Sequence, residues 1–274
     1  MVRARSGILS GPAGGIVGAV QVCKQAGFDR VISFDMGGTS TDVAHYKGEY
    51  ERDFETEIAG VRLRTPVLSI HTVAAGGGSK LHFSGGRFRV GPDSAGADPG
   101  PVCYRKGGPL TVTDCNVMLG RIQPKYFPSV FGEDGNQPLD KKKVEEKFEE
   151  LTEEVNQETE NTKTPEEVAS GFLEIAIENM ANAIKKISLQ RGYDISNYVL
   201  CCFGGAGGQH VCRIAENLGV EKILIHPYAG LLSAYGMGLA NIRAMNQQAV
   251  EEILNQKSMK NVAQTKKELI KAGR

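Results

Sequence analysis

The 274-residue sequence lacks tryptophan and lacks a net charge, because 32 Lys and Arg residues balance 32 Asp and Glu residues. Without an excess of one sign, no overall electrostatic field would draw the chain to nucleic acid or to an anionic membrane. No apolar run approaches the roughly 20 residues that a membrane span needs, and residues 1–10 lack the apolar centre of a secretory signal. We therefore expect a cytoplasmic globular protein that recognises its partners locally, with neither nucleic acid nor membrane among them.

A C-x-x-C pair is also missing, although the chain has six cysteines. Cys201 and Cys202 adjoin inside an apolar run. We predict that the cysteines are reduced and buried as small hydrophobic residues; the alternative is that one of them is a reactive thiol.

The two commonest nucleotide-binding signatures are absent as well: the Walker pattern, and the Rossmann glycine pattern after the first strand. The sequence offers instead three glycine clusters, each directly after a predicted strand. Glycine lets the backbone approach a ligand closely, and successive N–H groups in such a turn form a concave anion site. A single cluster could be an ordinary turn, but together they predict a phosphate-binding site. The clusters are Gly37 with Gly38; Gly76, Gly77 and Gly78; and Gly204, Gly205, Ala206, Gly207 and Gly208.

Polar side chains surround the first cluster. The hydroxyls of Thr39 and Ser40 can donate to phosphate oxygens, while the carboxylates of Asp35 and Asp42 can hold a hydrated Mg²⁺. The third cluster precedes a predicted helix, whose N-terminus would favour an anion or a nucleotide.

Elsewhere helical and strand patterns alternate, which predicts an α/β fold. The predicted elements are a helix from Ser10, a strand at 30–35, two antiparallel strands within 40–54 that turn at Lys47 and Gly48, a strand at 66–73, a hairpin about Gly85 and Gly86, a Gly/Pro-rich loop at 91–109, a helix capped by Thr113 or Asp114, a solvated helix at 139–160, a long central helix from Pro165 to about Gln190, strands at 197–203 and 221–227, and helices at 209–219 and 230–240.

Two of these segments, "FDMGGTSTDV" (34–43) and "FGGAGG" (203–208), resemble the phosphate and adenosine loops of the actin, hexokinase and heat-shock-chaperone ATPase superfold. Longer strings, among them "SIHTVAAGGGSKLHF" and "FGGAGGQHVCRIAENLG", closely resemble the hydantoinase A domain family over residues 6 to about 244. Within that family the chain is most similar to the ATP-hydrolysing 5-oxoprolinases. The resemblance implies an RNase H-like lobe of the superfold over residues 1–245, with a Gly/Pro-rich loop insertion, a long central helix, and a polar tail at 246–274.

The resemblance also implies a function: ATP hydrolysis coupled to the opening of a cyclic amide, 5-oxo-L-proline, to give L-glutamate. The cofactors would be ATP and Mg²⁺. Gly37, Gly38, Thr39 and Ser40 would hold the β- and γ-phosphates, Asp35 would orient Mg²⁺ or a water, and residues 204–208 would lie along the adenosine. Gly76, Gly77 and Gly78 complete the predicted nucleotide site, and Asp35, Asp42 and His71 are the predicted catalytic residues.

Relatives in this family carry a second, N-terminal lobe and a hydantoinase B region, neither of which this sequence contains. We therefore expect a fragment that is inactive alone, binds ATP weakly, and forms a homo-oligomer. The alternatives are an ATP-dependent hydantoinase or ketone-carboxylase subunit, and a non-catalytic actin-like nucleotide-binding module.

Three histidines are further candidates. His71 ends a strand immediately before the second cluster, and could act on substrate or bond the loop backbone. His82 and His210 could join it in a metal site, although their spacing matches no standard ligand signature.

Overall fold

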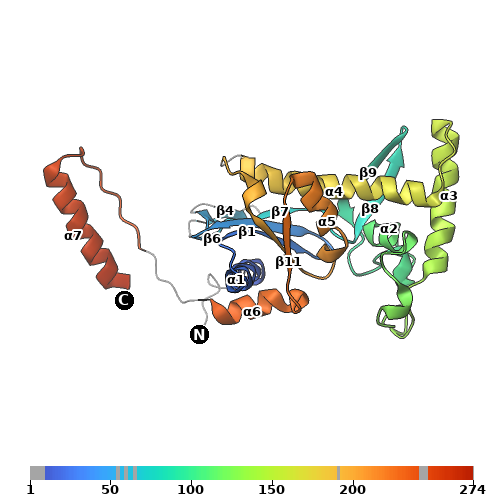
Figure 1. The fold of residues 1–274 in the computed structure, drawn as a ribbon, viewed down its shortest axis with the longest axis horizontal. Helices are drawn as coiled ribbons and strands as arrows, with labels where there is room; N and C mark the ends of the chain where they lie inside the picture. Colours follow the sequence, from blue (N-terminus) through green and yellow to red (C-terminus); the bar gives the residue numbers. More distant parts are fainter. Residues whose placement is uncertain are drawn as a thin grey trace. The chain divides into compact units, whose positions relative to one another are not determined.

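A computed structural model describes residues 10–53, 56–58, 61–63, 67–189, 192–240 and 246–273. Its centre is a five-stranded mixed sheet with the strand order β11-β10-β1-β2-β7 (Figure 1). β1 runs parallel to β10, and β10 runs parallel to β11, whereas β2 is antiparallel to both β1 and β7. The strands are β1 (Arg30–Met36), β2 (Thr41–Lys47), β7 (His71–Val73), β10 (Val199–Phe203) and β11 (Lys222–Ile225). The prediction of an α/β fold is confirmed.

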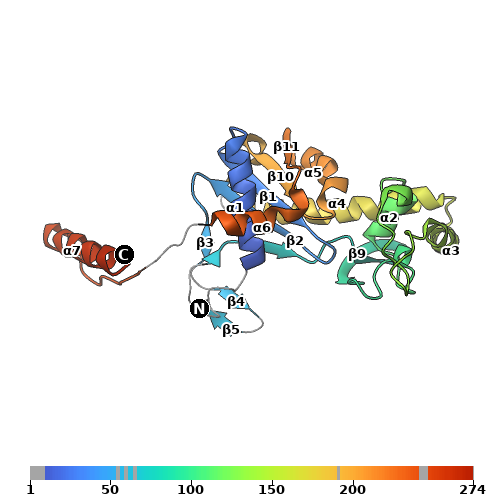
Figure 2. The ribbon, with the colours of Figure 1, turned by 90° about the horizontal axis from the view of Figure 1, so that it is seen from below.

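Helices cover both faces of this sheet. α1 (Ser10–Gln25) and α6 (Leu232–Leu239) lie on one face, while α4 (Pro165–Leu189) and α5 (Val211–Leu218) lie on the other (Figures 1 and 2). Neighbouring side chains of a strand point to opposite faces. Val31 accordingly joins the apolar cluster under α1 and α6, whereas Ile32 and Phe34 join the larger cluster under α4 and α5.

The predicted long central helix is α4, which begins at the expected proline. Val168, Phe172, Met180 and Ile184 form its fully buried stripe. α4 extends past the sheet and packs against α2 (Val112–Met118), α3 (Lys141–Thr159) and strand β9 (Arg87–Ser94) (Figure 1). The apolar cluster under α4 therefore continues past the sheet into a second region, formed by α2, α3 and β9.

Two predictions for this second region were wrong in detail. The predicted hairpin forms, from β8 (Ser79–Ser84) and β9, but β9 continues through residues 91–94, which the glycine and proline content had assigned to a loop. The N-cap of α2 is Thr111, not Thr113 or Asp114. Asp114 sits at the third helical position, where its carboxylate accepts a hydrogen bond from the Thr111 N–H (2.8 Å).

The remaining described elements are short, apart from the C-terminal helix. They are β3 (Arg52–Asp53), β4 (Thr56–Ile58), β5 (Val61–Leu63), β6 (Val67–Leu68) and the 3₁₀ turns Val102–Tyr104, Pro124–Tyr126, Ile195–Asn197, Gly207–Gln209 and Ala229–Leu231, with α7 (Gln256–Gly273). Residues 53–67 and 240–274 form a separate compact unit that includes α7. Among the described helices, none is long and apolar enough to cross a membrane.

The helices α1 and α6 touch backbone to backbone. A Cβ added at Gly236 would lie 1.9 Å from the Gly14 carbonyl oxygen and 2.4 Å from the Gly18 nitrogen. A Cβ added at Gly18 would in turn lie 2.4 Å from the Leu232 carbonyl oxygen. These glycines let the two helix axes approach closely, which fixes the position of α6 over the sheet.

This contact predicts opposite effects for two glycines of the same helix. Gly236→Ala should lower the free energy of unfolding by about 1–3 kcal/mol, because the new methyl group overlaps α1. Gly238→Ala, which has nothing within 4 Å of the added Cβ, should be neutral or stabilise by up to about 1 kcal/mol. Urea unfolding of both variants measures the difference, and equal stabilities would contradict the close contact.

Candidate functional site

The three glycine clusters meet at one end of the sheet. The turn between β1 and β2 closes through the Gly37 N–H and the Ser40 carbonyl (3.1 Å). The second cluster bonds directly to this turn, because the Gly77 N–H donates to the Gly37 carbonyl (3.2 Å) and the Gly78 N–H donates to the Gly38 carbonyl (2.6 Å). Clusters that are about 40 residues apart in the sequence therefore form one surface.

The third cluster reaches the same turn from the other side. The Ala206 N–H donates to the carbonyl of Met36, the last residue of β1 (3.0 Å). Gly204, at φ +86°, lies so close to β1 that an added Cβ would be 2.5 Å from both Asp35 Oδ1 and the Met36 carbonyl oxygen. Since β1 and β10 are parallel, their carboxyl ends bring the first and third clusters together.

The glycines fall into two groups by what surrounds them. Gly76, Gly77, Gly78, Gly204 and Gly207 are needed for packing, because an added Cβ at each would come within 3.0 Å of a neighbouring atom. An added Cβ would meet no atom within 4 Å in the other group, which comprises Gly38, Gly205 and Gly208. These open backbone positions are the ones that a ligand can approach.

Two carboxylates lie beside the first turn. Asp35 on β1 and Asp42 on β2 are direct cross-strand partners, so their side chains share a face of the sheet. Burial and the charge of Asp42 raise the pKa of Asp35 to about 6, opposed by a hydrogen bond from Ser233 on α6. Asp42 accepts a hydrogen bond from the hydroxyl of Thr72 (2.5 Å). Two facing carboxylates suit a hard divalent cation such as Mg²⁺.

His71 does not join these carboxylates. Asp42 pairs with Thr72 across the sheet, and Val43 pairs with His71. Because neighbouring residues alternate, His71 points to the face covered by α4, where burial and the charge of Lys186 lower its pKa. His71 therefore lies on the opposite face of the sheet from Asp35 and Asp42, and its catalytic role stays a prediction.

The other two histidines also lie apart. His82 pairs with Arg89 in the β8–β9 hairpin, whereas His210 is buried at the start of α5. In the described part of the chain, no three His, Cys, Asp or Glu side chains come together in a way that could hold a metal ion. A cation at Asp35 and Asp42 would thus take its other ligands from water and from a bound phosphate.

Comparison with known proteins identifies the family. The hydantoinase/oxoprolinase family matches residues 2–246. The chain belongs to this family. It is 48% identical to a 5-oxoprolinase of Dictyostelium discoideum over 268 residues, which cover 92% of this chain and 21% of the relative.

Two solved structures have a similar fold. The ATP-dependent caprolactamase of Pseudomonas jessenii superimposes with a TM-score of 0.80 at 30% identity, covering 96% of this chain and 38% of that one. A nucleotide-free acetone carboxylase, from a study of ATP-dependent acetone carboxylation, gives a TM-score of 0.72 at 25% identity, covering 96% of this chain and 37% of that one. This hydantoinase/oxoprolinase chain thus spans 21% of the curated relative's length and under two fifths of these structures.

Two residues of the candidate site were not predicted from the sequence: Thr72 and Ser233. Both belong to predicted elements, but no sequence pattern distinguishes either of them as a site residue. Their contacts to Asp42 and Asp35 join residues 30 and 198 positions apart along the chain. The only available signal was the alternation of β7, which places Thr72 on the same face as Asp42 once the register is known.

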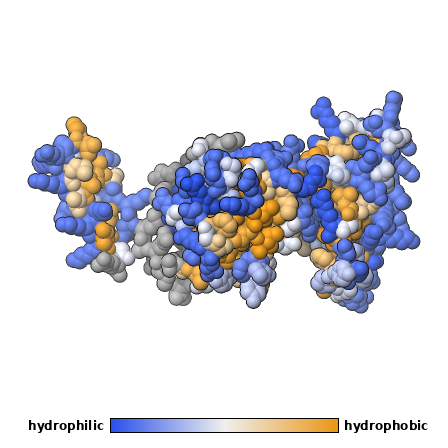
Figure 3. Space-filling model, viewed as in Figure 1, coloured by the Kyte–Doolittle hydropathy of each residue, from blue (hydrophilic) through white to orange (hydrophobic). Residues whose placement is uncertain are grey.

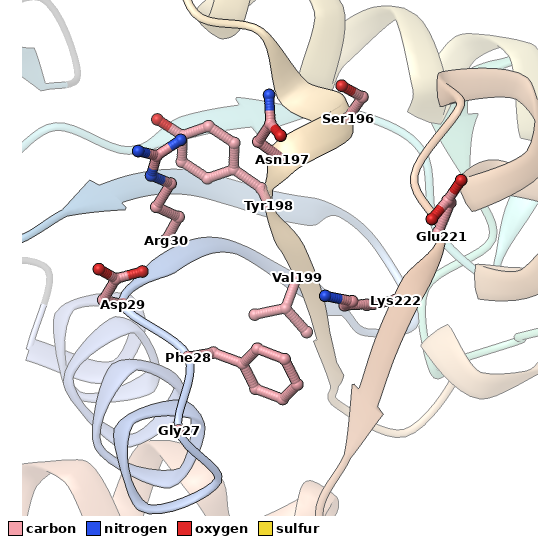
Figure 4. A pocket seen from close by; sticks show the side chains of 10 residues that line it. All are labelled: Gly27, Phe28, Asp29, Arg30, Ser196, Asn197, Tyr198, Val199, Glu221 and Lys222. Carbon is pink, nitrogen blue, oxygen red and sulfur yellow. The ribbon is translucent and has the colours of Figure 1, made fainter.

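A hollow of about 370 Å³ lies at the opposite end of the sheet (Figure 4). Its walls come from the amino ends of β1, β10 and β11, whereas the glycine clusters follow the carboxyl ends of β1 and β10. Its lining residues are Gly27, Phe28, Asp29, Arg30, Ser196, Asn197, Tyr198, Val199, Glu221 and Lys222. Because its charged side chains are exposed, this hollow is a feature of the outer surface and not part of the glycine-loop site.

The buried His210 predicts a pH dependence of stability. Burial and the charge of Arg121 lower its pKa to about 4. Between pH 6.5 and 4 the unfolded chain therefore binds a proton that the folded chain excludes, and stability is lost as the pH falls. The loss is on the order of 2–3 kcal/mol. Asp35 acts in the opposite direction over the same range, because its folded pKa is raised.

A comparison of the wild type with His210→Gln isolates this effect, since Gln cannot titrate. As the pH falls from 7 to 4.5, urea titrations at each pH should show the free energy of unfolding of the wild type falling relative to that of His210→Gln. A difference that is constant with pH would show that His210 titrates normally.

Proposed function

We propose that this chain is the nucleotide-binding lobe of a 5-oxoprolinase-type enzyme, which couples ATP hydrolysis to the opening of a cyclic amide. One observation carries the proposal: three glycine clusters converge on the Asp35–Asp42 pair in a chain that is 48% identical to a 5-oxoprolinase. The strand order, with β2 and β7 antiparallel and β10 and β11 parallel to β1, supports an RNase H-like lobe of the actin and hexokinase superfold.

The phosphates occupy the turn at Gly37–Ser40. A Cβ added at Gly38 would meet no atom within 4 Å, so the backbone at this residue can approach an anion closely. The hydroxyls of Thr39 and Ser40 donate to phosphate oxygens. Gly205 and Gly208, which are equally open, lie along the adenosine, and Gly76–Gly78 support the turn from behind through their hydrogen bonds to Gly37 and Gly38.

Asp35, with Asp42 beside it, would hold Mg²⁺, which would supply positive charge to neutralise the phosphates. In phosphoryl transfer the protein mainly positions groups and stabilises charge. A lactam is a stabilised amide, and transfer of a phosphoryl group to its carbonyl oxygen makes the carbonyl carbon accessible to attack by water. The likeness to a caprolactamase, an enzyme named for a lactam, favours a cyclic amide over a ketone as the substrate.

The rest of a longer polypeptide supplies the opposite wall of the nucleotide cleft. Large apolar side chains are exposed along one segment, over β11 and α6 (Figure 3): Ile225, Tyr228, Leu231, Tyr235, Met237 and Leu239. An exposed apolar patch of this kind indicates a packing surface. Since one wall leaves much of a ligand in water, this chain alone should bind ATP weakly and not turn over lactam. The cytoplasmic location and the homo-oligomer remain predictions from the sequence.

The first test replaces Gly38 with valine. The added side chain has open space in the folded chain, so stability should change little, but it fills the space that a phosphate needs. In the whole protein that contains this segment, the KM for ATP should rise at least tenfold. Gly76→Ala is the control for packing, because its Cβ would lie 2.8 Å from the Gly38 backbone and should lower stability. An unchanged KM for ATP in Gly38→Val would contradict the proposal that this turn binds the phosphates.

The second test replaces Asp35 with asparagine, which keeps the size of the side chain but removes its charge. Release of ADP that depends on 5-oxoproline and Mg²⁺ should fall by several orders of magnitude. Asp29→Asn, at the opposite end of the sheet, is the matched control and should leave turnover unchanged. A drop of less than about tenfold in Asp35→Asn, roughly 1.4 kcal/mol, would exclude the metal role.

A further inference from the structure

The short helix α2 contacts the second glycine cluster and His210, which follows the third cluster by two residues. At its start, the Thr113 N–H and hydroxyl both donate to the Gly77 carbonyl, at 2.8 Å and 2.9 Å. A Cβ added at Gly77 would lie 2.8 Å from Thr113 Oγ1 and 3.8 Å from the Ala206 methyl group. Thr113 therefore lies where the second and third clusters face each other.

One turn later, Asn116 contacts His210, two residues after the third cluster. Its Nδ2 lies 3.3 Å from Nε2 of His210 and 3.2 Å from the Val112 carbonyl oxygen, and both the Asn116 and the His210 side chains are buried. A carbonyl can only accept, so the bond to Val112 fixes the NH₂ group of the amide on this side. His210 Nε2 must then accept the second bond, which requires a neutral imidazole with its proton on Nδ1.

His210 connects this pair to the glycine loop through its own backbone. Its N–H donates to the Gly207 carbonyl (3.0 Å), and its carbonyl accepts from the Ile214 N–H (3.1 Å) at the start of α5. The burial that lowers the pKa of His210 to about 4 keeps the imidazole neutral near pH 7. The acceptor at Nε2 is thus present throughout the physiological range.

Between Thr113 and Asn116, the buried carboxylate of Asp114 holds a third segment. It accepts hydrogen bonds from the N–H groups of Val102 (3.2 Å), Cys103 (2.9 Å) and Thr111 (2.8 Å). α2 is therefore fixed on its other side by the Gly/Pro-rich segment, which makes it a firm support for the loops that it contacts.

We infer that Asn116 and His210 are positioning residues that hold the 204–208 loop against α2 in the geometry that accepts a nucleotide. The inference rests on the proposed function, because it assumes that this loop binds ATP. The hydrogen bond joins residues 94 positions apart, and it is buried, so removal of Asn116 leaves Nε2 of His210 without its partner. Neither residue touches the nucleotide in this arrangement; each acts through the glycine loop.

The first arm of the test examines the wild-type chain of 274 residues with ¹⁵N-labelled histidine by NMR. His210 should show the Nδ1–H tautomer, assigned by its absence in His210→Gln, and it should not titrate between pH 5 and 8. An Nε2–H tautomer, or a midpoint above pH 6, would overturn the inference without any variant having to fold differently.

The second arm measures ATP kinetics in the whole protein that contains this segment. Asn116→Leu and His210→Leu, which remove one partner each, should raise the KM for ATP about tenfold with kcat changed less than threefold. His210→Gln can present an amide oxygen near the position of Nε2 and should restore a KM close to that of the wild type. His82→Leu, in the hairpin, is the matched control and should have no effect.

The outcomes separate the two proposals. An unchanged KM in Asn116→Leu, with a wild type that responds to ATP, would overturn the positioning role and leave the proposed function intact. A wild type whose lactam opening does not depend on ATP would overturn both. Equal losses in His210→Gln and His210→Leu would show that the imidazole fills space and does not position the loop through Nε2.

Discussion

The site depends on one set of contacts: backbone hydrogen bonds between glycine-rich loops that come from distant parts of the chain. The Gly77 and Gly78 N–H groups bond to the β1–β2 turn, and the Ala206 N–H bonds to the end of β1. These bonds form only where no side chain separates the loops, as the added-Cβ distances at Gly76 and Gly204 demonstrate. The glycines therefore serve two purposes, since some allow the loops to pack and others leave backbone open to a ligand.

The faces of the sheet divide the chemistry. Asp35 and Asp42 lie on the face covered by α1 and α6, where the glycine contact between these helices brings Ser233 next to Asp35. Thr72 extends the same row of polar side chains on β7. On the other face, Asn116 and His210 meet beside members of the larger apolar cluster, such as Cys115 and Val211. Charge thus gathers on one side of the loops and rigid packing on the other.

The position of Asp35, half-buried and opposite Asp42, changes its affinity for a proton. A half-buried carboxylate opposite a second carboxylate holds its proton more tightly, which is why its pKa rises to about 6. A divalent cation would remove this penalty, because it favours both carboxylates in their charged form. The Mg²⁺ that we propose at this pair would therefore act on the same repulsion that raises the pKa of Asp35.

The sequence by itself determined the order of the elements and the places of the glycine clusters. Periodic apolar residues mark α4 from Pro165, and a glycine pair marks the β8–β9 hairpin, because both signals are local. The resemblance of strings around Gly37 and Gly204 also placed the chain in its family. Only the tertiary structure decided that His71 points away from Asp42, that Thr72 takes its place, and that Asn116 meets His210. These facts follow from strand register and helix packing, which join residues far apart in the chain and leave no local pattern.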